Sequence, residues 1–333
     1  MALRFLEVRL PRDVHDEADG ISESHDVIDQ WCTPADDEEL HQYLLESQHV
    51  EPLVDAFRSR FGDVRIIVMP VEATIPRAAP PEPDPVLPVD PEPTPKAKDR
   101  ISREELYEDI NDGITLSPTF LALAAISAVV ASIGLIRDDL VAIIGAMVIA
   151  PLLGPNMALA LGTTLADFDL LRRSLKSGLA GIGLSFAVAF GIGIFVTVDP
   201  TAPEIAARTG PDLGHMVLAL ASGVAGALAF TTGVSASVVG VMVAVALLPP
   251  LATAALLLAH GQTDDALGAL VLLGTNLAAV NLAGVATFVV QGIRPLWHSE
   301  KATARRAARN AIILWTLVAV LFGYALLHTS GVL

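Results

Sequence analysis

The pattern of hydrophobic and polar positions changes character near residue 114. Upstream, apolar and polar residues alternate over short stretches, which is the period of a strand with one buried face. The alternation predicts strands at residues 3–10 (LRFLEVRL) and 64–71 (VRIIVMPV), a third at 40–47, and a weaker one at 27–31. Downstream, long apolar runs replace the alternation, so the chain holds two regions of different kinds.

Within the upstream region, residues 49–61 show the helical period. Leu53, Val54 and Phe57 fall on one face of a helix there. A helix combined with short strands predicts a small α+β sandwich of ferredoxin-like type over residues 1–75.

Residues 76–99 form an acidic, proline-rich segment that predicts a linker. Nine prolines fall within residues 76–95, a composition that favours an extended, semi-rigid spacer. The segment therefore separates the α+β domain from the apolar region downstream.

Residues 100–113 predict a short amphipathic helix. Ser102 followed by Glu105 has the spacing of a capping box, which marks the start of a helix. The apolar positions would let this helix lie on the surface of a membrane. These positions are Ile101, Leu106 and Ile110.

Hydropathy over residues 114–333 predicts seven membrane spans. Each reaches about the 17–25 residues that a bilayer requires. The fold class is therefore an α-helical polytopic membrane protein with a small N-terminal α+β domain. The spans are expected at about 118–136, 140–165, 175–198, 213–231, 235–259, 267–290 and 310–328.

Two stretches within this region are variations on one another. Residues 117–155 align without a gap with residues 212–250, and ten of the 39 pairs are identical, among them Pro155 with Pro250. The alternative is convergence of two apolar helices of low complexity. The shared register of the Gly-x-Met-Val and Leu-Leu-x-Pro patterns favours duplication.

The repeat extends to three spans in each copy. The copies cover about 117–198 and 212–290, and the span at 310–328 lies outside them. Because three is odd, the second copy would cross the membrane upside down. Such a 3+3 inverted repeat is typical of secondary transporters.

The distribution of Lys and Arg predicts the orientation. Twelve basic residues fall on one side of the predicted spans, and the other side has only Arg137 and Arg208. We therefore expect a multi-pass protein of the inner (plasma) membrane whose N-terminus is cytoplasmic and whose C-terminus is outside. The twelve are Lys96, Lys98, Arg100, Arg103, Arg172, Arg173, Lys176, Arg294, Lys301, Arg305, Arg306 and Arg309.

Both repeat copies carry prolines inside an apolar span, which predicts broken helices. Pro151, Gly154 and Pro155 interrupt the second span, and Pro249 and Pro250 interrupt the fifth. Inversion would bring the two breaks toward each other near the middle of the membrane. The amide ends of the half-helices would suit a small anion, whereas freed carbonyls would suit a cation. The alternative is a pair of packing kinks.

Four polar side chains complete the candidate solute-binding set. Asn156 and Thr253 follow the two breaks, and Asn276 and Asn281 lie in the sixth span. Two asparagines inside one apolar span are costly unless they are bonded. The alternative is hydrogen bonding between helices that only holds the bundle together.

Composition narrows the classes of function. Residues 1–113 hold 27 acidic and 11 basic residues, and the remaining residues hold 10 of each. The acidic region argues against binding of nucleic acid, which needs a basic face. Cys32 is the only cysteine, so an internal disulfide is excluded.

The sequence patterns predict neither an enzyme nor a cofactor. No Walker, HxxE, CxxC or GxSxG motif occurs, and no Asp, Glu, Lys or Arg falls in the interior of a predicted span. His15, His25, His41 and His49 lie among acidic residues and are interpreted as solvated. With a lone Cys32, they predict no metal site.

Four segments resemble a known family. They are VMPVEATIPR (68–77), ISREELYEDINDGITLSPTFLAL (101–123), SAVVASIGLIRDDLVAIIGAMVIAPLLGP (127–155) and LLGTN (272–276). Together they resemble the bacterial and archaeal family catalogued as domain of unknown function 389, an uncharacterised hydrophobic membrane domain. The resemblance implies an integral membrane protein with a soluble N-terminal domain. It implies no activity and no substrate.

The leading hypothesis is a secondary transporter or channel for a small solute whose site lies at the paired broken helices, and a small anion is the first expectation for that solute. The alternative is a membrane-anchored sensor or scaffold whose cytoplasmic domain binds a ligand or a protein partner. The expected partners are the lipid membrane, the small solute and further copies of the chain in a dimer or trimer.

Overall fold

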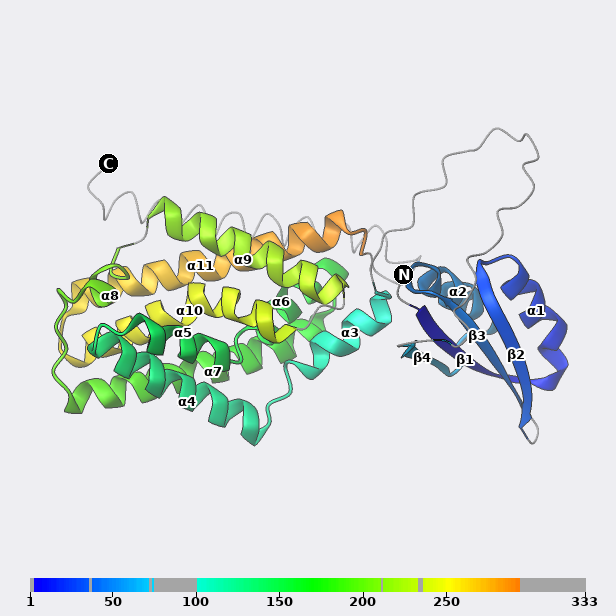
Figure 1. The fold of residues 1–333 in the computed structure, drawn as a ribbon, viewed down its shortest axis with the longest axis horizontal. Coiled ribbons are helices and arrows are strands. Elements are labelled where there is room, and N and C mark those ends of the chain that lie inside the picture. Colours follow the sequence, from blue (N-terminus) through cyan, green and yellow to red (C-terminus); the bar gives the residue numbers. More distant parts are fainter. Residues whose placement is uncertain are drawn as a thin grey trace. The chain divides into compact units, whose positions relative to one another are not determined.

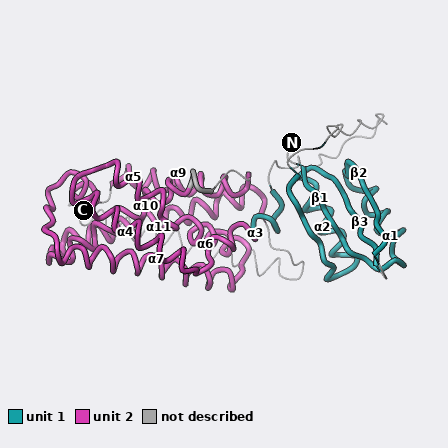
Figure 2. Tube along the Cα trace, turned by 60° about the horizontal axis from the view of Figure 1, so that its bottom comes forward, with its two compact units in different colours: residues 1–106 teal, residues 107–333 magenta. Residues whose placement is uncertain are grey.

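The computed structural model describes residues 3–35, 38–71, 74, 101–210, 212–232 and 236–293. The chain divides into two compact units, residues 1–106 and residues 107–333 (Figure 2). The predicted linker at 76–99 and the predicted seventh span at 310–328 lie outside the described residues.

The N-terminal unit contains a four-stranded antiparallel sheet in the order β2-β3-β1-β4 (Figure 1). The sequence of strands and helices, β-α-β-β-α-β, is that of a ferredoxin-like fold. The four predicted strands are confirmed with shifted ends. The elements are β1 (Leu3–Pro11), α1 (His15–Glu23), β2 (Val27–Ala35), β3 (Glu38–Glu46), α2 (Ser47–Phe61) and β4 (Ile66–Val71).

The core of this unit lies between the sheet and its two helices. Alternate residues of β1, including Leu6, Val8 and Leu10, are fully buried against apolar residues of α2 such as Leu53 and Phe57. Burying a side chain of this size stabilises a fold by about 1.5–3 kcal/mol. The period-two pattern seen in the sequence is thus the pattern of the core.

Helix α1 has no counterpart among the elements predicted from the sequence. Its sequence, HDEADGISE, is mostly polar, and Ala18 and Ser22 are its buried residues. Partly buried Ile21 packs against the same core. A helix with so narrow an apolar stripe gives little periodic signal, so only the tertiary contacts identify it.

Helix α3 (Arg103–Asp112) begins as the capping box predicts. The backbone N–H of Glu105 donates to Ser102 Oγ at 3.2 Å. Its apolar positions, Ile101, Leu106 and Ile110, have at most 4% of their surface exposed. The expected contact of this helix with a membrane surface stays a prediction.

The second unit is made of long apolar helices. Five described helices are long and apolar enough to cross a membrane, and α5 with α6 adds a sixth if the pair, bent by 53°, is one span. The helices are α4 (Pro118–Ile136), α5 (Leu140–Ile149), α6 (Leu153–Leu165), α7 (Phe168–Phe195), α9 (Leu213–Thr232), α10 (Ala236–Ala259) and α11 (Thr263–Val290), with a short α8 (Pro203–Ala206).

One predicted feature of these helices is wrong. The sequence analysis expected an interruption of the fifth span at Pro249 and Pro250. Instead, α10 is a single helix that contains both prolines. The predicted break in the second span is confirmed, because α5 ends at Ile149 and α6 begins at Leu153.

The helices of this unit pack as two connected groups. Helix α4 contacts α5 and α7, and α6 contacts α7; likewise α9, α10 and α11 contact one another. The groups meet where α10 packs on α7 and α5, and where α11 packs on α6. Figure 1 shows these helices running side by side.

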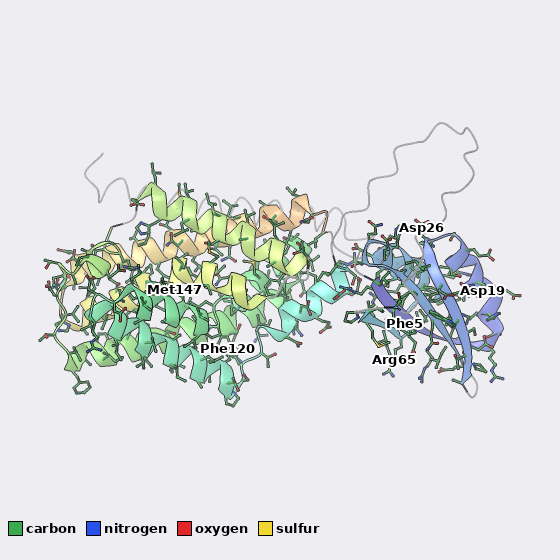
Figure 3. The ribbon with its side chains drawn as sticks, in the orientation of Figure 1. Phe5, Asp19, Asp26, Arg65, Phe120 and Met147 are labelled. Atoms are coloured by element: carbon green, nitrogen blue, oxygen red, sulfur yellow. The ribbon has the colours of Figure 1, made fainter. Side chains whose placement is uncertain are left out.

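The outer surface of the helical unit is apolar. Val141 is 80% exposed and Phe195 is 88% exposed, and many other large apolar side chains also face outward. Figure 3 shows mainly carbon on the helices around Phe120 and Met147, whereas oxygen and nitrogen are dense around Asp19, Asp26 and Arg65. Such a surface indicates a membrane protein, because lipid is the solvent that it matches.

Candidate functional site

The break between α5 and α6 results from Pro151. Proline has no backbone N–H and its ring clashes with the carbonyl four residues earlier, so a helix cannot continue through it easily. The residue before a proline is also pushed to extended backbone. Ala150 has φ −64° and ψ 122°, as expected. Pro155 falls in the first turn of α6, where a backbone N–H has no helical partner to lose.

Gly154 allows a close approach next to this break. A Cβ added at Gly154 would overlap the carbonyl oxygen of Gly113, which belongs to the segment between α3 and α4. The backbone of one chain segment therefore lies directly against the first turn of α6. Any larger residue at position 154 must push the two segments apart.

Helix α10 contains two prolines, and a side chain of another helix replaces one of the backbone donors that they remove. Pro250 has no N–H to donate to the carbonyl of Ala246, four residues earlier. The side chain of Asn276, on α11, donates from Nδ2 to that carbonyl at 2.8 Å. Asn276 is 1% exposed, so this bond satisfies a buried carbonyl where water does not reach it.

A second amide network joins α6 to α11. Asn281 Nδ2 donates to Asn156 Oδ1 at 3.0 Å and to the carbonyl of Leu277 at 2.9 Å. Asn156 Nδ2 donates to the carbonyl of Leu152, at the break, at 2.7 Å. Both asparagines are buried. The network therefore holds the broken span against the sixth span.

Three buried oxygens of the predicted site residues have no hydrogen-bond partner among the described residues. They are Thr253 Oγ1 on α10, and Asn276 Oδ1 and Asn281 Oδ1 on α11. The three residues are at most 1% exposed. Most buried polar atoms in proteins are bonded, so each such atom calls for an explanation such as water or a bound ion.

The structure brings most, but not all, of the predicted site together. Asn156 and Asn281 are bonded to one another, and Asn276 reaches the proline-containing part of α10. The expected pair of facing helix ends is not formed, because α10 has no break. The carbonyl of Ala246 was not among the predicted site groups. Its position four residues before Pro250 is the signal that could have identified it.

Comparisons with known proteins identify the family of this chain. The family model of domain of unknown function 389 (DUF389) matches residues 147–282, which include α6, α10 and most of α11. An uncharacterised protein of Methanocaldococcus jannaschii is 32% identical over 333 residues, covering 98% of this chain and 100% of the relative. No solved structure matches the chain. Given this similarity over the whole length, the chain belongs to the DUF389 family.

Proposed function

We propose that the protein is a secondary transporter or channel for a small solute, with its site between α10, α11 and the α5–α6 break. The observation that carries the proposal is that one oxygen each on Thr253, Asn276 and Asn281 has no hydrogen-bond partner within the part of the chain that the structure describes. Leaving a buried polar group unbonded costs about 1–3 kcal/mol. Packing alone does not need three such groups on two neighbouring helices.

The free atoms favour a particular class of solute. Each asparagine must turn Nδ2 toward a backbone carbonyl, because a carbonyl only accepts. This requirement fixes the amide orientation, and neither Oδ1 atom then has a hydrogen-bond partner among the described residues. Free oxygens suit a small cation or a neutral solute that donates hydrogen bonds. The expectation of an anion needed two facing helix ends, and α10 does not supply one of them.

The proposal includes a three-pass unit that was duplicated and inverted. Its support is the pairing of matching elements: α6 packs on α11, and α10 packs on α7. Under the alignment of the copies, these two contacts are equivalent. Alternating movement of one copy against the other would then open the site to each side in turn. A cytoplasmic N-terminus, an external C-terminus and a dimeric or trimeric assembly are further parts of this proposal.

The test is solute flux into liposomes that contain the purified full chain. The panel comprises sodium and potassium ions, glycerol and urea as neutral donors, and chloride and acetate as anions. We expect flux of a cation or a neutral donor that exceeds flux in protein-free liposomes. Asn276→Ala and Thr253→Val should each lower this flux, since each removes a free oxygen.

Thr275→Val is the matched control. Thr275 is also buried on α11, but its hydroxyl already has a hydrogen-bond partner, because it donates to the carbonyl of Val271 at 2.9 Å. Flux should survive this change. Flux of no solute in the panel, or equal loss in the control and in the site variants, contradicts the proposal. Selective flux of anions would support a transport function but would contradict the proposed class of solute.

The sensor or scaffold hypothesis differs in where a ligand binds. It requires a ligand site in the N-terminal unit and a helical unit that only anchors the chain. Absence of flux together with ligand binding by residues 1–75 would favour it.

A further inference from the structure

Four side chains with metal-binding atoms meet on one side of the N-terminal unit. Cys32 on β2 pairs directly with His41 on β3, so their side chains point to the same face of the sheet. Glu39 precedes His41 by two residues on β3 and shares that face. Helix α1 covers it and contributes His15. The chain thus brings together residues that are up to 26 positions apart.

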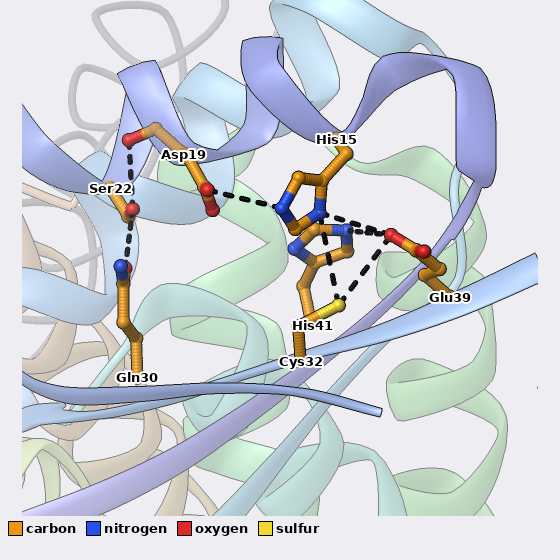
Figure 4. Close-up of polar contacts among 7 residues, drawn as sticks. All are labelled: His15, Asp19, Ser22, Gln30, Cys32, Glu39 and His41. Atoms are coloured by element: carbon orange, nitrogen blue, oxygen red, sulfur yellow. Dashed lines mark hydrogen bonds and ion pairs between the residues drawn. The ribbon is translucent and has the colours of Figure 1, made fainter. Parts of the chain in front are cut away.

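The donor atoms of this cluster are close to one another, as Figure 4 shows. His15 Nδ1 lies 3.0 Å from Glu39 Oε2, and Cys32 Sγ lies 3.5 Å from the same oxygen. His15 Nδ1 and Cys32 Sγ are 3.8 Å apart, and His41 Nε2 is 3.7 Å from Glu39 Oε2. One donor atom from each of the four lies within 4.8 Å of the others.

These separations match a tetrahedral metal site. Zn–N, Zn–S and Zn–O bonds of about 2.0–2.3 Å place neighbouring ligand atoms roughly 3.3–3.7 Å apart. Small side-chain rotations would therefore let all four donors reach a single ion.

A second observation points to a missing partner. His41 is 1% exposed, and its Nε2 has no hydrogen-bond partner among the described residues. Figure 4 shows this ring turned toward Glu39 and Cys32. A buried imidazole nitrogen without a partner is costly, and coordination of a metal would satisfy it.

The cluster also has the outer support that metal-binding histidines use. His15 Nε2 lies 3.3 Å from Asp19 Oδ2, one turn along α1. A carboxylate on the far nitrogen fixes the tautomer, so that the near nitrogen, Nδ1, is free to bind a metal.

We propose that His15, Cys32, Glu39 and His41 bind one divalent transition-metal ion, with zinc as the fitting ion. Two imidazoles, one thiolate and one carboxylate form a mixed donor set that suits zinc. Calcium and magnesium prefer sets made only of oxygen. The ion would join α1 to β2 and β3. The proposal does not rest on the transport function.

The test uses untagged, full-length protein in detergent after treatment with a chelator. Cobalt(II) is the probe, because its bond to a thiolate gives a charge-transfer absorption that reports Cys32 directly. We expect one cobalt per chain, displaced by an equimolar amount of zinc. Cys32→Ala should abolish the thiolate absorption and weaken zinc binding by more than about 100-fold. This loss exceeds the one expected when a residue that only contacts a metal ligand is substituted.

Two further variants distinguish a specific metal site from nonspecific binding of metal ions to the acidic surface. Asp19→Asn keeps all four donors and should weaken zinc binding by about 10- to 100-fold. His25→Gln is the matched control, since His25 lies outside the cluster and its Nδ1 is 2.8 Å from the carbonyl oxygen of Ile21. Its zinc affinity should equal that of the unchanged protein.

Several outcomes would overturn the site. They are the absence of the thiolate absorption, binding of much less than one ion per chain, and equal affinity in Cys32→Ala and the unchanged protein. If His41→Ala does not fold, exposed Cys32 and half-exposed His15 still provide variants that leave the core intact. Neither flux nor its absence bears on these readouts, so this proposal and the transport proposal fail independently.

Discussion

Under the proposed duplication, the second helix of the first copy is broken into α5 and α6, with a bend of 53° between them, whereas the aligned helix of the second copy, α10, is continuous from Ala236 to Ala259. Both copies contain aligned prolines, at 155 and 250. What differs is their surroundings. Pro151 in the first copy aligns with Ala246 in the second, so only the first copy has a proline at the point where its helix breaks.

The second copy also has a compensating donor that the first lacks. Asn276 of α11 satisfies the Ala246 carbonyl that Pro250 leaves free. At the same alignment offset, the first copy has Gly181, which has no side chain to donate. Whether a proline breaks a membrane helix therefore depends on whether a neighbouring residue can donate a hydrogen bond to the backbone carbonyl that the proline leaves free.

The largest expected effect comes from exchanging the residues at the aligned break position. Ala246→Pro should lower the free energy of unfolding by about 3 kcal/mol or more, because it places a third proline inside α10. The reciprocal Pro151→Ala should cost less than about 1 kcal/mol, because the backbone there already tolerates the change. Unfolding of both variants in mixed micelles measures the difference. Equal effects would show that position 151 does not decide the break.

A smaller effect is expected for the close approach beside the break. Gly154→Ala should destabilise by about 1–3 kcal/mol, since its Cβ would overlap Gly113. Gly145→Ala is the matched control on α5. A Cβ there meets nothing within 4 Å, and the change should stabilise by about 0.5–1 kcal/mol through helix propensity. Thermal unfolding in detergent distinguishes the two variants. Equal changes in their unfolding temperatures would show that close packing against Gly113 does not constrain position 154.

The compensation in α10 is testable as a double-mutant cycle. Asn276→Ala alone should cost about 1–3 kcal/mol, because the Ala246 carbonyl loses its donor. In a Pro250→Ala background, the restored backbone N–H can reach that carbonyl, so the same change should cost less, with a coupling of about 0.5–3 kcal/mol. Additive effects of the two changes would mean that Asn276 does not act through the proline.

The smallest effect concerns the contact between α6 and α11. A cycle of Asn156→Ala and Asn281→Ala should give a coupling of about 0.6 kcal/mol, the average for hydrogen bonds between membrane helices. The value should stay below the coupling of Asn276 with Pro250, because no proline-freed carbonyl is involved. A larger coupling here would place the main stabilising network at the break instead of in α10.

The sequence by itself determined most of the secondary structure of this protein, because strands, apolar helices and helix starts depend on local patterns of residues. Alternation specified the strands of the N-terminal unit, and long apolar runs specified α4 to α7 and α9 to α11. Pro151 marked a real break, and Ser102 with Glu105 marked the start of α3. Each of these features depends on neighbours within one or two turns, which a single sequence displays.

The tertiary structure alone decided which groups share an environment. It showed that the side chain of Asn276 donates to the carbonyl of Ala246, which Pro250 leaves free. It buried His41, which the sequence analysis had interpreted as solvated, and placed it with His15, Cys32 and Glu39. These pairings join residues far apart in the chain, and their energy arises only after folding removes water from between them.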